Sequence, residues 1–195
     1  MTDAQLITDY LDGDNRAFNT LVHRWQPSVH NFICRFMGSD SDVGDISQNV
    51  FLRVWQNLGV LKDRDRFSSW IFQIAVNQCR DHIRSVSRAR EHFPLADSEE
   101  PVETRAALGG AYSPDRADSG EDWRRILNSV LQTLPEDQRL VIVLKEYHGL
   151  RFNEIAHILQ ENENTLKARL YSGLKNVRRR LEHRGIRKED MIHEM

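Results

Sequence analysis

The chain runs FSSWIFQIAVNQCRDHIR from Phe67 to Arg84, and helical periodicity gives this segment two chemically different faces. At about 100° per residue, one side is an apolar stripe typical of a buried helix face, formed by Ile71, Ile74, Ala75, Cys79 and Ile83. The other side carries a ring, two amides and two cations, namely Trp70, Gln73, Asn77, Arg80 and Arg84. A single nucleic-acid strand binds such a mixture by stacking, base-edge hydrogen bonds and phosphate contacts. A tryptophan folded onto a neighbouring helix, beside a face that only solubilises, is the alternative interpretation.

The composition around this segment indicates an all-α protein. Glycine and proline are few in the 195 residues and stand mainly at helix boundaries. Cys34 and Cys79 are isolated, which fits a reducing cytosol and a role as small buried apolar residues. His30 and Cys34 stand one helical turn apart, but no further ligand completes a metal site. With no signal peptide and no long apolar run, we expect a soluble cytoplasmic protein without metal or cofactor.

Charge is segregated along the chain, although the formal net charge is only -2. Residues 91–122 carry a balance of about -7, lack periodicity and contain several prolines and glycines. This segment is predicted to be a flexible acidic linker. Residues 163–188 carry a balance of about +7, which indicates either a nucleic-acid footprint or a solvated helix end.

Helical patterns on either side of the linker predict two small helical domains. Residues 4–37 show helical spacing that is broken early at residues 12–14, and residues 45–61 form a further segment before the one quoted above. After the linker, one helix is expected from Trp123 to Leu134 and another that ends near His148. The expected organisation is therefore a domain at 1–90, the linker at 91–122 and a second domain at 123–195.

Residues 152–174 have the pattern of a helix-turn-helix. A short first helix buries Ile155, Ala156 and Leu159, and Asn162 or Asn164 is positioned to cap the second helix. The second helix exposes small, hydroxyl and basic side chains that suit a major groove, at Asn164, Thr165, Lys167, Ala168, Arg169, Tyr171, Ser172, Lys175 and Arg179. The turn is irregular because Gln160 and Glu161 replace the usual glycine and aliphatic residue, and Gly173 costs the helix about 1 kcal/mol relative to alanine. A plain helical hairpin with a basic surface is the alternative.

Four segments, in this order and spacing, resemble the extracytoplasmic-function (ECF) sigma factors of the sigma-70 family. Residues 45–55, DISQNVFLRVW, are similar to the family's D-L-x-Q-E-x-F-x-x-x-W, and residues 67–84 to F-x-S-W-L-x-x-I-A-x-N-x-x-x-D-x-x-R. Leu134-Pro135, Arg139 and residues 147–156 match the start of the family's C-terminal domain, and TLKARL at 165–170 resembles T-V-K-S-R-L. Asn49 departs from the acid of the pattern, and Ala168 and Ser172 replace more polar or basic residues.

The resemblance implies a non-enzymatic promoter-specificity factor for bacterial RNA polymerase. The first domain would bind the clamp helices of the β′ subunit through Asp45, Gln48, Asn49, Phe51 and Arg53. It would open the -10 element with Trp70, Gln73, Asn77, Arg80, Arg84, Lys62 and Arg64. The second domain would bind the -35 duplex through the exposed helix face described above, and the linker would follow the RNA exit path. Further partners would be the β subunit and an anti-sigma factor, free or membrane-bound.

Other classes of protein fit fewer of these features. A stand-alone helix-turn-helix regulator would use residues 123–188 but leave Trp70 and Asn77 without a role. A metal-dependent phosphohydrolase could cite Asp81 and His82, but no second His or Asp stands at usable spacing, and Asp81 is placed to pair with Arg80 or Arg84. A purely regulatory partner of the polymerase would need no DNA-reading helix.

Overall fold

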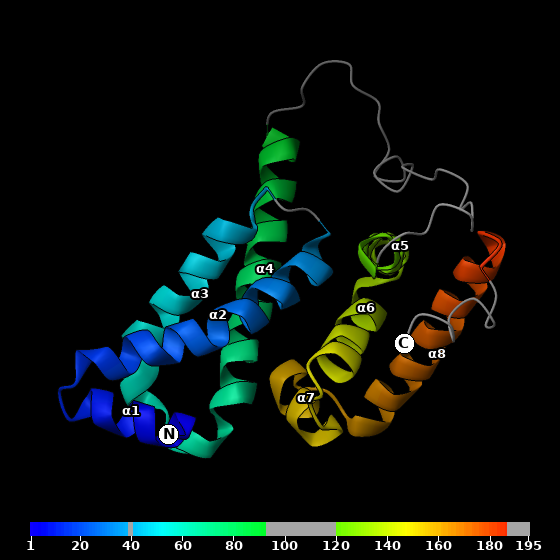
Figure 1. Ribbon diagram of the computed structural model, residues 1–195. Coiled ribbons are helices and arrows are strands. Elements are labelled where there is room, and N and C mark those ends of the chain that lie inside the picture. Colours follow the sequence, from blue (N-terminus) through cyan, green and yellow to red (C-terminus); the bar gives the residue numbers. More distant parts are fainter. Residues whose placement is uncertain (39–40, 93–119, 187–195) are drawn as a thin grey trace.

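The computed structural model describes residues 1–38, 41–92 and 120–186, and every regular element in these ranges is helical (Figure 1). The first group contains α1 (Asp3–Leu11), α2 (Asn15–Met37), α3 (Val43–Asn57), η1 (Leu58–Val60), η2 (Arg64–Arg66) and α4 (Phe67–His92). The second contains α5 (Gly120–Gln132), α6 (Glu136–Ile142), the π-helical turn η5 (Val143–Tyr147), α7 (Phe152–Leu159) and α8 (Glu163–His183). The all-α prediction is confirmed, and the expected linker lies outside the described residues apart from its ends.

Local capping explains where the first helices begin and end. Thr2 and Gln5 form a reciprocal capping box at the start of α1. Asp14 caps α2 by accepting the Arg16 N–H at 2.9 Å, so the polar break predicted at residues 12–14 does separate two helices. Helix α2 ends at Gly38, whose φ of 71° is the left-handed conformation that glycine adopts without strain.

Helices α2, α3 and α4 enclose the core of the first group. The predicted stripe of α4 is largely confirmed, since Ile71, Ala75 and Cys79 are fully buried. Phe72 and Val76 are buried as well, which the stripe did not include. The reason is visible for Phe72, whose ring lies 4.6 Å from that of His148 in the second group. Helix α4 is therefore covered on more sides than an amphipathic surface helix.

The two groups of helices pack directly against each other, which the sequence did not predict (Figure 1). The Arg35 guanidinium lies 4.0 Å from the centre of the Tyr147 ring and donates to Asn128 at 3.1 Å. The Arg35 carbonyl accepts from Gln132 Nε2 at 2.8 Å. Next to it, burial and the Arg35 charge lower the pKa of His148 to about 4, so a neutral imidazole fills the space against Phe72.

The helix-turn-helix forms with an unexpected residue at its turn. Gln160 ends α7 with a φ of 54°, the only positive φ of a non-glycine among the described residues. This conformation costs about 1–2 kcal/mol for an L-residue other than Gly. Asn162 then caps α8, accepting the Asn164 N–H at 2.8 Å, which settles which of the two asparagines is the cap.

Gly173 has a packing role that offsets its low helix propensity. A Cβ added there would lie 2.8 Å from Ile142 Cδ1 and 3.3 Å from Gln138 Cβ, because α8 crosses α6 at this point. Gly44, within α3, has nothing within 4 Å of the same added atom. The two glycines are therefore opposite cases, one required by packing and one not.

We predict that Gly173→Val lowers the free energy of unfolding by about 1–3 kcal/mol, because the added methyl groups force α6 and α8 apart. The matched variant Gly44→Ala should raise it by about 0.5–1 kcal/mol, since it gains helix propensity without a clash. Urea denaturation of both variants measures the difference. Equal effects of the two substitutions would contradict the packing role of Gly173.

Candidate nucleic-acid interface

An apolar groove lies between α2 and α3 on the first group of helices. It has a volume of about 470 Å³, and its apolar lining includes Phe18, Val22, Phe51 and Leu52. Leu52 and Trp55, both on α3, remain 47% and 54% exposed. Large apolar side chains left exposed together, with a polar rim, mark a site that another protein covers. We call this surface the α2/α3 groove.

The residues predicted to bind polymerase are distributed around this groove. Gln48 and Phe51 line it directly. Asp45 and Asn49 are exposed on the same helix, α3, and stand outside the groove lining. Arg53 is also exposed but lines a different pocket, on the side of α3 that faces α4. Trp55, the last residue of the family pattern at 45–55, is not among the predicted contacts, although it is exposed and lines the groove.

The second hollow lies between α3 and α4 and holds the tryptophan of the opening segment. This Trp70 pocket has a volume of about 360 Å³ and is lined by Arg53, Asn57, Val60, Trp70, Ile74, Asn77, Gln78 and Asp81. The Trp70 ring is half-buried and lies 5.9 Å from the Phe67 ring, so it is held by the core and still forms a pocket wall. An apolar wall beside amide, cationic and anionic groups suits a flat polar ring such as a nucleobase.

The predicted strand-binding face of α4 divides into two parts. Trp70 and Asn77 line the pocket together. Arg80 points toward the second group of helices, where its Nε lies 3.3 Å from Glu136 Oε1. Arg84 is exposed and pairs with Asp81 at 3.3 Å, while Gln73 is half-buried.

The loop before α4 is only partly free to contact a ligand. Lys62 is exposed. Arg64 donates to the hydroxyl of Thr8 on α1, so its guanidinium holds the loop to the N-terminal helix. Arg66, next to it, pairs with Asp63 at 3.0 Å.

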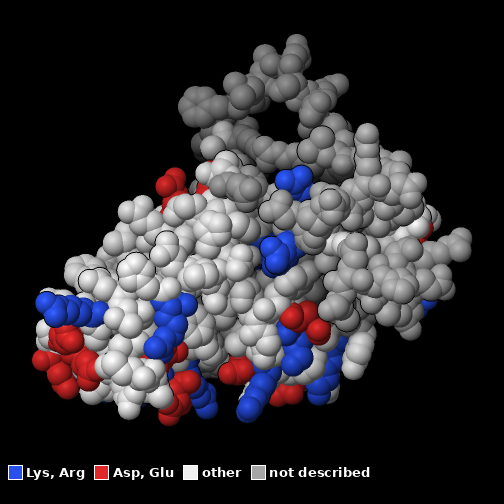
Figure 2. All heavy atoms as spheres, viewed as in Figure 1, with Lys and Arg blue, Asp and Glu red and all other residues white. Residues whose placement is uncertain are grey.

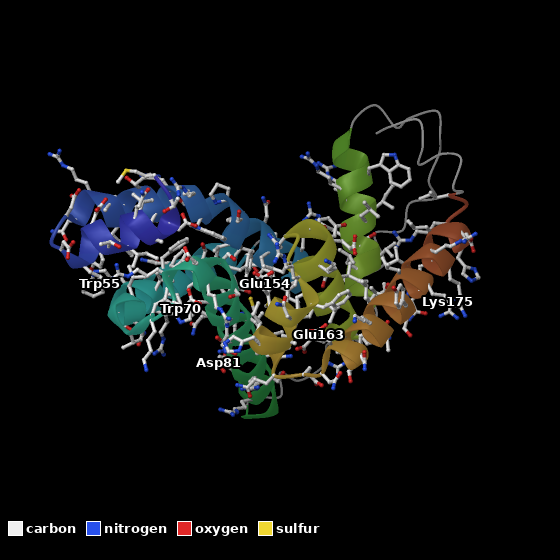
Figure 3. All side chains as sticks on the ribbon, turned by 90° about the horizontal axis from the view of Figure 1, so that it is seen from below. Trp55, Trp70, Asp81, Glu154, Glu163 and Lys175 are labelled. Atoms are coloured by element: carbon white, nitrogen blue, oxygen red, sulfur yellow. The ribbon has the colours of Figure 1, made fainter. Side chains whose placement is uncertain are left out.

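The helix-turn-helix presents a mixed polar face along α8. The predicted contact residues Asn164, Thr165, Ala168, Tyr171, Ser172 and Lys175 are exposed, and Tyr171 reaches 69%. Figure 3 shows Lys175 on α8 well away from Trp70 and Asp81 on α4. Figure 2 shows acidic and basic side chains interspersed at the lower end of the second group, so the surface there is not uniformly basic.

Arg169 is engaged within the domain. Its side chain is 27% exposed and contacts Asp137 at 3.0 Å and Glu161 at 3.0 Å. This contact gives a reason for Glu161 in the irregular turn, because its carboxylate ties the turn to α8. Lys167, by contrast, makes a looser pair with Glu163 at 3.8 Å and lies 5.6 Å from the Phe152 ring centre.

Other chemistry considered from the sequence finds little support in the described ranges. His30 Nδ1 and Cys34 Sγ lie 3.5 Å apart, but residues 1–38, 41–92 and 120–186 contain no group of His, Cys, Asp and Glu that could hold a metal. Burial and, to a lesser extent, Glu136 raise the pKa of the Cys79 thiol to about 12. His82 pairs with Asp42 at 3.4 Å while Asp81 lines the pocket. Of the helices in these ranges, none has the length and apolarity of a membrane span.

Comparison with known proteins identifies both groups of helices. Residues 21–89 match the family Sigma-70 region 2, and residues 124–177 match Sigma-70, region 4. The chain is 31% identical to the ECF RNA polymerase sigma-E factor of Escherichia coli over 172 residues, 88% of this chain and 90% of that protein. It is 29% identical to the RNA polymerase sigma-H factor of Pseudomonas aeruginosa over 183 residues, 92% of this chain and 94% of that protein.

The fold agrees with solved sigma factors. The sigma factor RpoE of Bartonella quintana, solved with the anti-sigma factor NepR, superposes with a TM-score of 0.69 at 18% identity, covering 85% of this chain and 96% of that one. CnrH, solved with the cytosolic domain of CnrY, gives 0.66 at 24% identity, covering 93% and 97%. Regions 2 and 4 together define a sigma-70-type transcription initiation factor. The chain belongs to the ECF sigma factors of this family.

We predict that Arg169→Ala lowers the free energy of unfolding by about 1 kcal/mol, because it leaves Glu161 of the turn and Asp137 of α6 without their shared cation. Lys167→Ala should change it by less than about 0.5 kcal/mol, since an exposed pair contributes little. Thermal or urea unfolding of the two variants makes the comparison. If both lose the same stability, Arg169 does not brace the turn.

Proposed function

We propose that this sigma factor divides its work among three surfaces that the described residues form. The α2/α3 groove binds core polymerase, the Trp70 pocket captures the opened -10 strand, and α8 binds the -35 duplex. The corresponding domains are 1–90 and 123–195, with 91–122 as the linker. The observation that carries this proposal is that α3 contributes to both the groove and the pocket. Because α3 is shared, a polymerase bound in the groove is held at a fixed distance from the Trp70 pocket.

The groove supports the polymerase contact through its shape and chemistry. A helical partner lays an apolar face into a groove and anchors side chains about one turn apart. Phe51 and Trp55, four residues apart on α3, provide such anchors, and Gln48 and Asp45 supply a polar rim. The clamp helices of the polymerase β′ subunit are the partner we assign to it, with the β subunit near the second domain. Asn49 beside this rim contributes hydrogen bonds in place of the acid's charge.

The Trp70 pocket supports the proposed strand capture because it offers a half-buried ring for stacking and polar side chains for contacts with base edges. Stacking on an aromatic side chain stabilises a bound base by about 1–3 kcal/mol, which offsets the few kcal/mol needed to unstack it. Asn77 and Gln78 supply amides that can donate and accept at base edges. Arg53 adds a cation to the pocket wall, and Arg84 is held next to it by its ion pair with Asp81. Exposed Lys62, on the loop before α4, is the further cation that we assign to the strand. Gln73 lies on the adjoining part of α4, at the margin of this surface.

Helix α8 supports duplex binding through its exposed N-terminal half. Thr165 and Ser172 carry hydroxyls, Lys175 carries a charge, and Tyr171 is the most exposed ring. The helix begins at Glu163, and the partial positive charge of its N-terminal end favours a phosphate there. Arg169 contributes indirectly by holding the turn, and Lys167 supplies a phosphate contact at the rim.

The packed arrangement has to open before both promoter elements can be bound together. Sites about 25 base pairs apart are separated by roughly 85 Å along B-DNA. A compact chain of this length has a radius of gyration of about 16 Å, so it cannot span that distance. The segment between α4 and α5 is long enough to reach roughly 90 Å when extended. Opening would also release Arg80 from Glu136 and return it to the -10 face.

The proposed partners of the chain indicate how its activity is regulated and where in the cell it acts. The sigma factor RpoE of Bartonella quintana, which superposes on this chain, was solved with the anti-sigma factor NepR. We propose a comparable partner for this chain, bound over the exposed apolar residues of the α2/α3 groove and so competing with polymerase. Since bacterial polymerase transcribes DNA in the cytoplasm, the chain would act there. A stand-alone helix-turn-helix regulator is less well supported, because the groove and the Trp70 pocket would have no partner.

We predict that Trp70→Ala combined with Asn77→Ala reduces open-complex formation on a cognate promoter by at least tenfold, since stacking and edge contacts are lost together. Binding to core polymerase should stay unchanged because the groove is untouched. Permanganate footprinting and a core-binding assay measure the two steps. The matched control Trp55→Ala should weaken core binding and leave the pocket intact. Normal opening by the double variant would refute the role of the pocket.

A further inference from the structure

The Trp70 pocket is too long for one base. Trp70 and Asp81 both line it from α4, eleven residues apart, which corresponds to roughly 16 Å along a helix. Figure 3 shows the two labelled residues separated along the same helix. Val60, Trp70 and Ile74 form an apolar end, and Asn77, Gln78 and Asp81 form a polar end. A base stacked on Trp70 therefore leaves the polar end open to the next nucleotide of the strand.

Asp81, the aspartate of the family pattern, places a negative charge at a surface that receives a polyanion. Its side chain is 65% exposed, so core packing does not require it there. Its ion pair with Arg84, at 3.3 Å and with Arg84 63% exposed, is the exposed i,i+3 type that contributes little stability. A carboxylate facing DNA repels phosphates unless it accepts a hydrogen bond from the nucleic acid. Such a bond has to come from an N–H group, because a carboxylate only accepts.

The bases differ in the group that they carry at C4 of a pyrimidine or C6 of a purine. Cytosine and adenine carry exocyclic amino groups at N4 and N6, whereas thymine presents the O4 acceptor in the corresponding place. Thymine also has an N3–H, but that donor lies between two carbonyl oxygens that repel a carboxylate. A carboxylate accepts from an amino group and repels a carbonyl oxygen. Arg53 enters the same pocket from α3 and can donate to a base carbonyl or phosphate on the other wall. Asn77 and Gln78 do not discriminate between an amino group and a carbonyl oxygen, because amides both donate and accept hydrogen bonds.

We propose that Asp81 is a specificity-determining residue that selects, next to the base stacked on Trp70, a nucleotide with an exocyclic amino group and rejects thymine. The inference rests on the proposed strand-capturing role of the pocket and adds a second reading position to it. The selection acts in the single strand, where the amino group is free of its Watson–Crick partner. Arg84 holds the carboxylate on the surface of α4 and does not itself distinguish bases.

The test compares two bases of the same shape that differ in their hydrogen-bonding groups at C4 and N3. Holoenzyme reconstituted with the full chain is titrated against promoter forks whose -10 region is single-stranded, with 5-methylcytosine or thymine placed at each position in turn. The wild-type chain should prefer 5-methylcytosine at one position by on the order of tenfold in Kd. Asp81→Asn should reduce that preference to about twofold, mainly by improving binding of thymine, because the amide can donate to O4.

Two further variants separate this inference from the proposed function beneath it. Arg84→Ala should keep the preference, since it removes the ion pair and leaves the carboxylate. Trp70→Ala should weaken binding of all forks and keep the same preference in what remains. If Asp81→Asn retains the wild-type ratio at every position while Trp70→Ala weakens binding, Asp81 does not select the base and the pocket still captures the strand. If Trp70→Ala binds every fork normally, the strand-capturing role itself fails.

Discussion

The packing of α4 is the constraint on which the remaining structure depends. Its apolar stripe, with Ile71 and Cys79, is buried against α2 and α3. Phe72, on another side, meets His148 of the second domain. Only the side with Trp70 and Asn77 stays open, as one wall of the pocket. Because two sides are fixed by burial, the third presents its ring and amides with little freedom, which lowers the entropy cost of holding a base.

The interface between the domains combines burial with polar contacts that water can replace. Arg35 meets Tyr147 through its guanidinium and Gln132 through its carbonyl, and Arg80 meets Glu136. Arg80 and Glu136 are 34% and 44% exposed, so separating them costs little. His148 packs against the rings of Phe32 and Phe72, and burial lowers its pKa to about 4, so its imidazole is uncharged at neutral pH. We propose that this interface keeps the domains together in the free chain and opens when polymerase and DNA contacts compete with it.

The helices and the chemistry of their faces could be predicted from the sequence, whereas which helices pack against one another could not. The breaks at residues 12–14, the cap at Asn162 and the stripe of α4 followed from local rules, because capping and periodicity act within a few residues. The burial of Phe72 depends on a domain more than seventy positions away, and no local pattern encodes it.

Two residues show the same limit at the candidate site. Arg53 is predicted to contact polymerase because it falls in the α3 motif, and that contact stays a prediction; the structure shows its side chain lining the Trp70 pocket. The Gln160 turn was noted as irregular, but the contact of Glu161 with Arg169 that supports it required the folded arrangement. In both cases, the residue type indicates which kind of contact the side chain can make, but the sequence does not predict the direction in which the side chain points. Direction is set by which helix packs alongside.

We propose that the free chain is packed and that it opens when it acts at a promoter. The distance between the two domains distinguishes these forms most directly. Spin labels at Thr20→Cys and His183→Cys, with Cys34 replaced by Ser, report that distance by pulsed electron paramagnetic resonance. The account predicts a single distance below about 45 Å in the free chain, as a compact fold of this size allows. In the holoenzyme bound to promoter DNA, the distance should exceed about 60 Å, since the two promoter elements lie roughly 85 Å apart. The same short distance in both states, or a broad long distribution in the free chain, would contradict it.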